Sequence, residues 1–134
     1  MSADKTVLVT MNVQGIGPEA ALQPEASLHG RDAHGRYTYG GGLARVLDML
    51  RRQGIRATLF WPVFEAERCR ALLEQSLRDG HEAASQGNAF EDLAALGDRE
   101  GEVLERARDR LAGLTGSVPQ GFRYTSSAFT ARTV

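Results

Sequence analysis

Apolar and polar residues follow one another along the chain in an order that predicts strands and helices in turn. The first apolar run, residues 6–13 (TVLVTMNV), is rich in β-branched residues, which is typical of a parallel strand buried on both faces. Residues 56–61 (RATLFW) predict a second strand, and residues 81–85 (HEAAS) a short third one. A fourth strand is expected over residues 118–124, although proline and glycine weaken its pattern.

Three segments between these strands carry apolar residues at helical spacing. Gly54, Gly80 and Gly116 follow the three segments, and glycine commonly stands just past the end of a helix. Asp98 is expected to cap the start of the third helix. The β-α-β-α-β-α-β order predicts right-handed crossovers, a parallel sheet and an α/β fold. The three apolar faces are Leu43, Val46, Leu47 and Leu50; Cys69, Leu72, Leu73 and Leu77; and Val103, Leu104, Ala107, Leu111 and Leu114.

The carboxyl ends of the predicted strands are the places to search for function. Parallel α/β sheets place their ligands and chemistry at that edge. Residues 14–40, which follow the first strand, are rich in glycine and polar residues and show no sustained period. Long connections of this kind in compact domains are usually functional or disordered. The strand-end segments are residues 12–17, 61–64, 85–90 and 123–127.

Composition and charge exclude several classes of protein. The chain has 134 residues, 42% of them hydrophobic, and a formal net charge of -1, which fits one domain and argues against a nucleic-acid partner. No run of 18 apolar residues exists, so we expect no membrane span, and residues 1–5 show no secretory signal, so we expect a cytoplasmic protein. The single cysteine, Cys69, excludes a disulfide within the chain and a cysteine-based zinc site.

Four stretches stand at these strand ends in a characteristic order. They are VLVTMNVQG, GRYTYGGGLARVLDMLRRQGIRATLFWP, LRDGHEAASQGNAFED and LAGLTGSVPQGFRYTSS. Together they resemble the polysaccharide deacetylases, the NodB-homology domain of carbohydrate esterases, over residues 6–134. The resemblance implies a distorted, often incomplete β/α barrel that uses a divalent metal to hydrolyse the N-acetyl amide of a sugar.

The chemical positions of that family are substituted in this chain. The resemblance implies an acidic pair after the first strand, where Asn12 and Gln14 stand, and two histidines after the third, where Gln86 and Phe90 stand. An amide cannot act as a general base, and neutral amides and a phenyl ring are poor ligands for zinc, magnesium or calcium. We therefore expect no metal and no other cofactor. Arg123 matches the arginine that orients the base in the family.

The remaining site residues are predicted by their place at the strand ends or in the long loop. Asn12, Gln14 and Gln86 either line a polar pocket for a neutral amide or sugar, or belong to a decayed site without a role. The residues expected to contact a small-molecule or carbohydrate ligand are Gln86, Phe90, Trp61, Tyr37, Tyr39 and Tyr124. The tyrosines could stack on a sugar ring or pack within the loop, and Trp61 could be a stacking platform or part of the core.

Three functions remain open at this point. The first is a degenerate deacetylase that is catalytically impaired and binds an amide-bearing ligand. The second is a metal-independent hydrolase of a small cyclic amide, because Asn12-Val13-Gln14, residues 35–40 and Phe90 resemble the allantoinase-type branch of the family. The third is a non-catalytic interaction module.

Length sets one further expectation. A full barrel takes about 200–250 residues, so we expect residues 1–134 to be a single domain equivalent to the N-terminal half of a barrel. An open parallel sheet has unpaired edges that favour association. The sequence therefore predicts a homodimer, a complementing partner chain or a truncated gene product.

Overall fold

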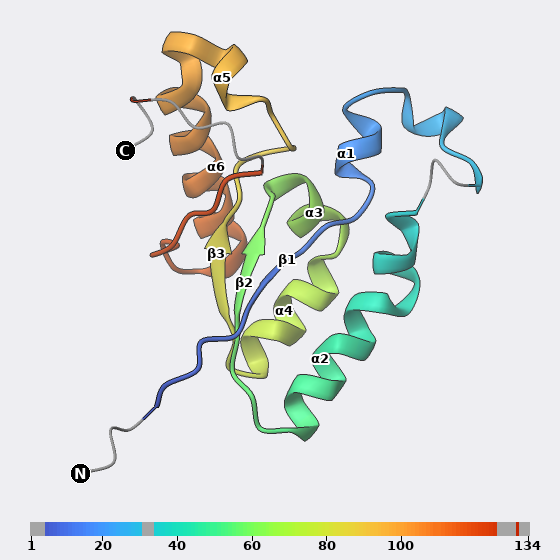
Figure 1. Ribbon diagram of the computed structural model, residues 1–134, viewed down its shortest axis with the longest axis vertical. Coiled ribbons are helices and arrows are strands. Elements are labelled where there is room, and N and C mark those ends of the chain that lie inside the picture. The colour runs from blue at the N-terminus through green and yellow to red at the C-terminus, as the bar shows by residue number, and fades with distance from the viewer. Residues whose placement is uncertain (1–4, 31–33, 126–130, 132–134) are drawn as a thin grey trace.

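A parallel three-stranded sheet forms the centre of the protein (Figure 1). The computed structural model describes residues 5–30, 34–125 and 131. Because adjacent strands are consecutive in sequence and parallel, each connection crosses the same face of the sheet, as in a segment of a β/α barrel. The predicted α/β class and parallel sheet are confirmed, and the sheet of the described residues is open. The strands, in spatial order, are β1 (Thr10–Asn12), β2 (Thr58–Trp61) and β3 (Glu82–Ser85).

Helices α2, α4 and α6 pack their apolar faces against the sheet and form the core with it (Figure 1). Leu47, Leu59, Leu73 and Leu111 meet there with no exposed surface. No helix in the described ranges is long and apolar enough to span a membrane. The helices are α1 (Gly17–Ala20), α2 (Leu43–Arg52), α3 (Val63–Arg68), α4 (Arg70–Arg78), α5 (Leu93–Leu96) and α6 (Glu100–Thr115), with the short turns η1 (Glu25–Ser27), η3 (Thr38–Gly42) and η4 (Gly97–Arg99).

The glycines predicted to follow the three main helices have the expected conformation. Gly54, Gly80 and Gly116 have φ values of 65°, 83° and 80°. A side chain is strained in this left-handed region, whereas glycine adopts it freely. These three ends of helices are therefore confirmed.

The first strand is shorter and more exposed than predicted. The strand covers only residues 10–12, although Val9 and Val13 also form backbone hydrogen bonds with β2, and Val7 and Leu8 are 82% and 84% exposed. The prediction of a strand over residues 6–13 buried on both faces is wrong, because β1 lies at the edge of the described sheet and has a neighbour on one side only.

Two helix boundaries also differ from the prediction. The second helical segment is broken at Cys69, whose φ of -103° and ψ of 32° separate α3 from α4. Asp98 does not cap the third helix, since it lies in η4 and α6 begins after Arg99. The capping carboxylate is Asp92, which accepts the N–H of Ala94 at the start of α5, a helix that the apolar spacing did not reveal.

The predicted fourth strand is reduced to a single bridge. Phe122 pairs in parallel with Ser85 at the end of β3, and no strand spans residues 118–124. Pro119 lacks the N–H that a longer ladder would need. The bridge nevertheless brings the segment that carries Arg123 to the carboxyl edge of the sheet, because the N–H of Arg123 donates to the carbonyl of Ser85 at 3.0 Å.

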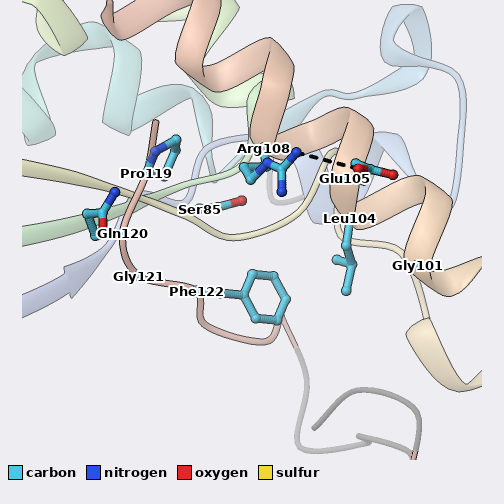
Figure 2. Close-up of a pocket in the computed structure, with 9 residues that line it drawn as sticks. All are labelled: Ser85, Gly101, Leu104, Glu105, Arg108, Pro119, Gln120, Gly121 and Phe122. Carbon is cyan, nitrogen blue, oxygen red and sulfur yellow. Dashed lines mark ion pairs between the residues drawn. The ribbon is translucent and has the colours of Figure 1, made fainter. Parts of the chain in front are cut away.

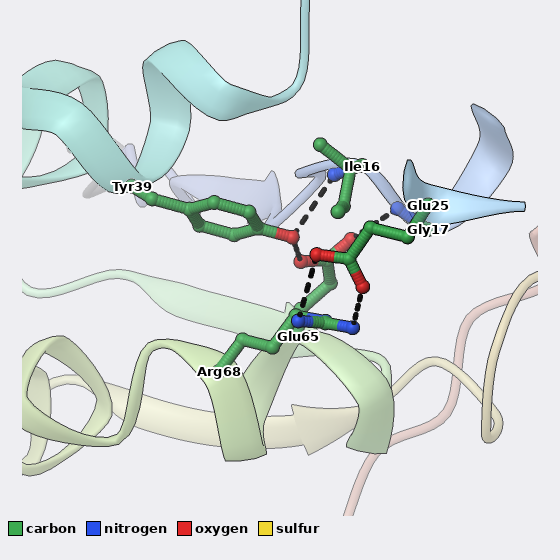
Figure 3. A network of polar contacts seen from close by, with 6 residues as sticks. All are labelled: Ile16, Gly17, Glu25, Tyr39, Glu65 and Arg68. Atoms are coloured by element: carbon green, nitrogen blue, oxygen red, sulfur yellow. Dashed lines mark hydrogen bonds and ion pairs between the residues drawn. The ribbon is translucent and has the colours of Figure 1, made fainter. Parts of the chain in front are cut away.

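A buried carboxylate fixes the loop that leaves β1 (Figure 3). Glu65 of α3 has no exposed surface, and its Oε1 accepts the backbone N–H groups of Gly15 at 3.0 Å and Gly17 at 2.8 Å. The Tyr39 hydroxyl donates to Oε2 of Glu65 and accepts the N–H of Ile16 at 3.0 Å. One carboxylate therefore joins α3, η3 and the β1–α1 loop.

The backbone of the β1–α1 loop packs closely against the Glu65 carboxylate. A Cβ on Gly15 would overlap the Glu65 carboxylate and the Tyr39 hydroxyl, so this position requires glycine. Burial and the hydrogen bond to Glu65 raise the pKa of Tyr39, so the phenol stays protonated and remains a donor. Glu25 and Arg68 form an ion pair beside this group (Figure 3).

We expect Glu65→Ala to lower the free energy of unfolding by about 3 kcal/mol, because two backbone N–H groups and a phenol lose their buried acceptor. The matched control is Glu67→Ala in the same helix, which removes an exposed ion pair with Arg110 and should cost less than about 1 kcal/mol. Urea unfolding followed by circular dichroism measures both. Equal losses for the two variants would contradict the anchoring role of Glu65.

We expect Cys69 to be inert toward thiol reagents in the folded protein. The side chain is buried, and desolvation, helped by the Glu65 carboxylate, raises the pKa of the thiol to about 12. The thiolate is the reactive form, so at about pH 8 the native protein should react far more slowly than the same protein in guanidinium chloride. Colour release from a disulfide reagent measures this, and a native rate equal to the unfolded rate would refute it.

Candidate functional site at the carboxyl edge of the sheet

Arg123 lies across the carboxyl edge of the sheet and joins residues far apart in sequence. Its Nη1 donates to Oδ1 of Asn12 at 2.9 Å, and its Nη2 donates to Oγ1 of Thr10 at 2.8 Å. The guanidinium carbon lies 4.0 Å from the centroid of the Phe60 ring, within the range of a cation–π contact. Two predicted site residues, Asn12 and Arg123, are therefore in direct contact.

Gln86 holds the segment that carries Arg123. Its Nε2 donates to the carbonyl of Tyr124 at 3.3 Å, and its own backbone N–H donates to the carbonyl of Trp61 at 3.0 Å. The side chain is 1% exposed, and its Oε1 has no hydrogen-bond partner among the described residues. Gln86 is thus buried directly after β3, and its hydrogen bond brings Tyr124 to the same edge.

Gln14 and Phe90 face a second part of this edge, a cavity of about 500 Å³. Phe90 has a positive φ of 58°, which is uncommon for a residue with a side chain. The backbone carbonyl of Gln14 accepts the Thr38 hydroxyl at 2.6 Å. The other residues that line the cavity are Pro18, Ala21, Leu22, Glu91, Asp92 and Thr125.

Three aromatic residues predicted to contact a ligand lie in different surroundings. Trp61 is fully buried in the core, so of the two predicted alternatives, a stacking platform or part of the core, the structure supports the second: β2 directs this ring toward the helices. The Tyr39 hydroxyl is already engaged in hydrogen bonds with the Glu65 carboxylate and the Ile16 N–H. Tyr37 is 62% exposed and its hydroxyl accepts a hydrogen bond from Arg45 of α2 at 3.1 Å.

A different cavity, of about 490 Å³, lies between α6 and the segment that follows it (Figure 2). Leu104, Arg108 and Phe122 line it, and Arg108 forms an ion pair with Glu105 at 3.5 Å. None of the predicted site residues lines this cavity. It is therefore separate from the Asn12–Arg123 contact.

The described residues at the carboxyl edge are poor candidates for a metal site. Within the described ranges, no group of three His, Cys, Asp or Glu residues could hold a metal ion. The oxygen of Asn12 already accepts a hydrogen bond from a guanidinium, and a second cation beside it would be repelled. Neutral amides compensate that repulsion poorly, so the donor set does not fit a divalent metal.

Sequence reasoning missed Glu65, Thr10 and Phe60. Glu65 stands four residues before Cys69, which places it on the apolar side of the helical segment, and this spacing was a signal of a buried acid. Thr10 and Phe60 gave no comparable signal, because their part in the site depends on the position of Arg123. That position follows from the bridge to β3 rather than from any local pattern.

Comparison with known proteins identifies the fold of this site. A protein of Mycobacterium smegmatis classed as a polysaccharide deacetylase superposes with a TM-score of 0.84 at 27% identity, covering 94% of this chain and 45% of that chain. An allantoinase gives 0.75 at 22% identity, with 94% and 48% covered. A family 4 carbohydrate esterase from Bacillus anthracis gives 0.67 at 19% identity, with 94% and 51% covered.

This chain spans about half the length of these solved structures. No curated protein sequence matches it. The sequence profile of the polysaccharide deacetylases matches residues 37–134, which is most of the chain and includes Gln86, Phe90 and Arg123. The parallel sheet, the helices on one face and this match together show that the chain belongs to the polysaccharide deacetylase family.

Proposed function

We propose that this chain is a polysaccharide-deacetylase-like protein that binds a small amide-bearing or carbohydrate ligand and does not carry out metal-dependent deacetylation. The observation that supports this most directly is the hydrogen bond from Arg123 to Asn12 at 2.9 Å. The side chain that the family resemblance places as the general base is a neutral amide whose oxygen is occupied by a cation.

The loss of charge affects both steps of the chemistry that the family resemblance implies. An amide oxygen does not accept a proton near neutral pH, so Asn12 cannot activate water. Activation of water by a metal requires a bound metal ion. The carboxyl edge offers neutral groups and a guanidinium in place of the anionic ligands that would bind one. Polar groups capable of hydrogen bonding to a ligand remain.

A relative gives a precedent for a protein of this kind. One solved structure is described as a mutant of a CE4-family pseudoenzyme with restored enzymatic activity; it superposes with a TM-score of 0.64 at 13% identity, covering 92% of this chain and 38% of that chain. That protein supports an experiment in which the substituted positions of this chain are returned to acids and histidines.

We expect the purified chain to hold no stoichiometric zinc and to release no acetate from N-acetylglucosamine oligomers. The quadruple variant Asn12→Asp, Gln14→Glu, Gln86→His and Phe90→His should gain zinc, because it restores ionisable ligands. The matched control is the double variant Asn12→Asp, Gln14→Glu, which lacks the imidazoles and should bind zinc more weakly. Elemental analysis and an acetate assay measure these results, and zinc with acetate release by the unmodified chain would overturn the proposal.

A metal-independent hydrolase of a small cyclic amide is the second candidate. Phe90 beside Gln14 in the cavity gives it partial support, because an apolar wall next to an amide suits a small uncharged ring. Allantoin and hydantoin are therefore included as substrates in the same assay, with and without EDTA. Turnover that persists in EDTA would favour this candidate over the binding function.

We also propose that a second copy or a partner chain covers the apolar residues at the ends of the sheet. Val7 and Leu8 beside β1 are 82% and 84% exposed, and Val118 and Phe122 beyond β3 are 56% and 40% exposed. Exposed apolar side chains next to unpaired strand edges favour association.

We expect the double variant Val7→Thr, Leu8→Thr to lower the mass measured by light scattering, because it makes this edge polar. Leu22→Thr, which changes a leucine of α1's C-terminal flank that is 88% exposed, is the matched control and should leave the mass unchanged. A monomeric mass for the unmodified chain at micromolar concentration would contradict the expectation.

A further inference from the structure

Neighbouring residues hold the Arg123 guanidinium in place, but none of its described side-chain partners carries a negative charge. Its two side-chain hydrogen-bond partners in the described part of the chain, Asn12 and Thr10, are uncharged, and it forms no ion pair with any carboxylate there. These bonds use two of its five N–H groups, which leaves three donors, including Nε–H, for another acceptor.

The Asn12 carboxamide adds further donors at the same place. A guanidinium has donors only, so the atom of Asn12 that faces it must be the oxygen, and the Nδ2 group points away from that contact. Nδ2 has no hydrogen-bond partner among the described residues. Asn12 and Arg123 together therefore present N–H groups beside one fixed positive charge.

The position of the guanidinium is set before any ligand arrives. The Phe60 ring supports it at 4.0 Å, and the backbone of Arg123 is bonded to Ser85 at 3.0 Å. Asn12 is exposed and Arg123 is only partly buried, so solvent reaches both. Ordering a long side chain costs conformational entropy, and a preordered guanidinium binds a planar oxyanion with less further loss.

Nearby acids limit the charge of the anion. Thr10 pairs with Thr58, and Thr58 with Glu82, so the Glu82 carboxylate lies in the same row of the sheet, where it accepts the Thr58 hydroxyl at 2.5 Å. Glu91 and Asp92 line the neighbouring cavity. One fixed cation among these acids suits a single negative charge and disfavours a dianion.

We propose that Arg123 and Asn12 bind the carboxylate group of a small monoanionic ligand at the carboxyl edge of the sheet. This inference rests on the ligand-binding function proposed above and specifies the chemical class of the ligand. The guanidinium forms the paired N–H···O contacts that carboxylates accept, and the Asn12 Nδ2 group supplies an additional donor. Gln86 acts as a positioning residue, since it holds the carbonyl next to Arg123.

The test uses metal-free, chelator-treated protein and N-acetylglycine as the carboxylate probe. Binding is followed by NMR through the Nε–H signal of Arg123, identified by its absence in Arg123→Gln. We expect N-acetylglycine to shift this signal in a saturable manner, and its uncharged amide, N-acetylglycinamide, to leave it unchanged. Inorganic phosphate, which is largely dianionic at pH 8, should bind more weakly.

Two variants and one control separate binding from folding. Asn12→Asp has nearly the same shape but supplies an internal carboxylate to Arg123, so it should weaken N-acetylglycine binding by at least about 10-fold. Arg123→Gln should weaken it similarly, as measured from other shifted signals. Arg45→Gln, which removes an exposed cation of α2 bonded to Tyr37, should retain binding.

Loss of binding in Asn12→Asp and Arg123→Gln with retention in Arg45→Gln supports the site. No saturable shift, equal binding by Asn12→Asp, or stronger binding of phosphate would overturn it. None of these measurements involves metal or acetate release. Failure of the carboxylate assignment is therefore distinguishable from failure of the proposed function.

Discussion

Parallel pairing of strands in sequence order is the constraint on which the rest of this structure depends. It sends every crossover to one face, where α2, α4 and α6 form a single apolar core with the sheet. It also gathers the carboxyl ends of the strands at one edge, so that Asn12 and Arg123, 111 positions apart, meet at 2.9 Å. The opposite face carries the polar side chains of Thr10 and Asn12, the Phe60 ring and the segment that carries Arg123.

The sequence predicted the helices and strands that bury a continuous apolar face. It did not predict features that depend on contacts with segments far away in the chain. The α2 helix and the β2 strand were foreseen, because the spacing of their apolar residues is local information. The exposure of Val7 and Leu8 was not, since a β-branched segment has the same pattern at the edge of a sheet as in its middle. The family resemblance matched Arg123 to the arginine that orients the base, but it did not predict the hydrogen bond to Asn12. The supporting Thr10 and Phe60 could not be found without the register of β1 on β2.

Glu65 shows how the loop at this edge obtains its shape. A loop rich in glycine leaves many backbone N–H groups without partners, and such groups are costly when buried. Here the Glu65 carboxylate accepts hydrogen bonds from two of these N–H groups, and the Tyr39 phenol oxygen accepts a hydrogen bond from a third. Because its oxygens have these partners, the acid can be buried on an otherwise apolar face of the helix. The glycine at position 15 is the counterpart of that arrangement, because any side chain there would meet the carboxylate.

The charge at the strand ends decides which ligands this edge can hold. A divalent cation is stabilised by anionic donors, and an oxyanion by N–H groups around a fixed cation, so the same cluster cannot favour both. Because Asn12 is neutral, it does not compensate the positive charge of the Arg123 guanidinium. Its oxygen faces the guanidinium, so its Nδ2–H groups point away from that contact. A change of one atom in a side chain, from a carboxylate oxygen to an amide nitrogen, is thus enough to reverse the electrostatic preference of the edge while its hydrogen-bonded frame is retained.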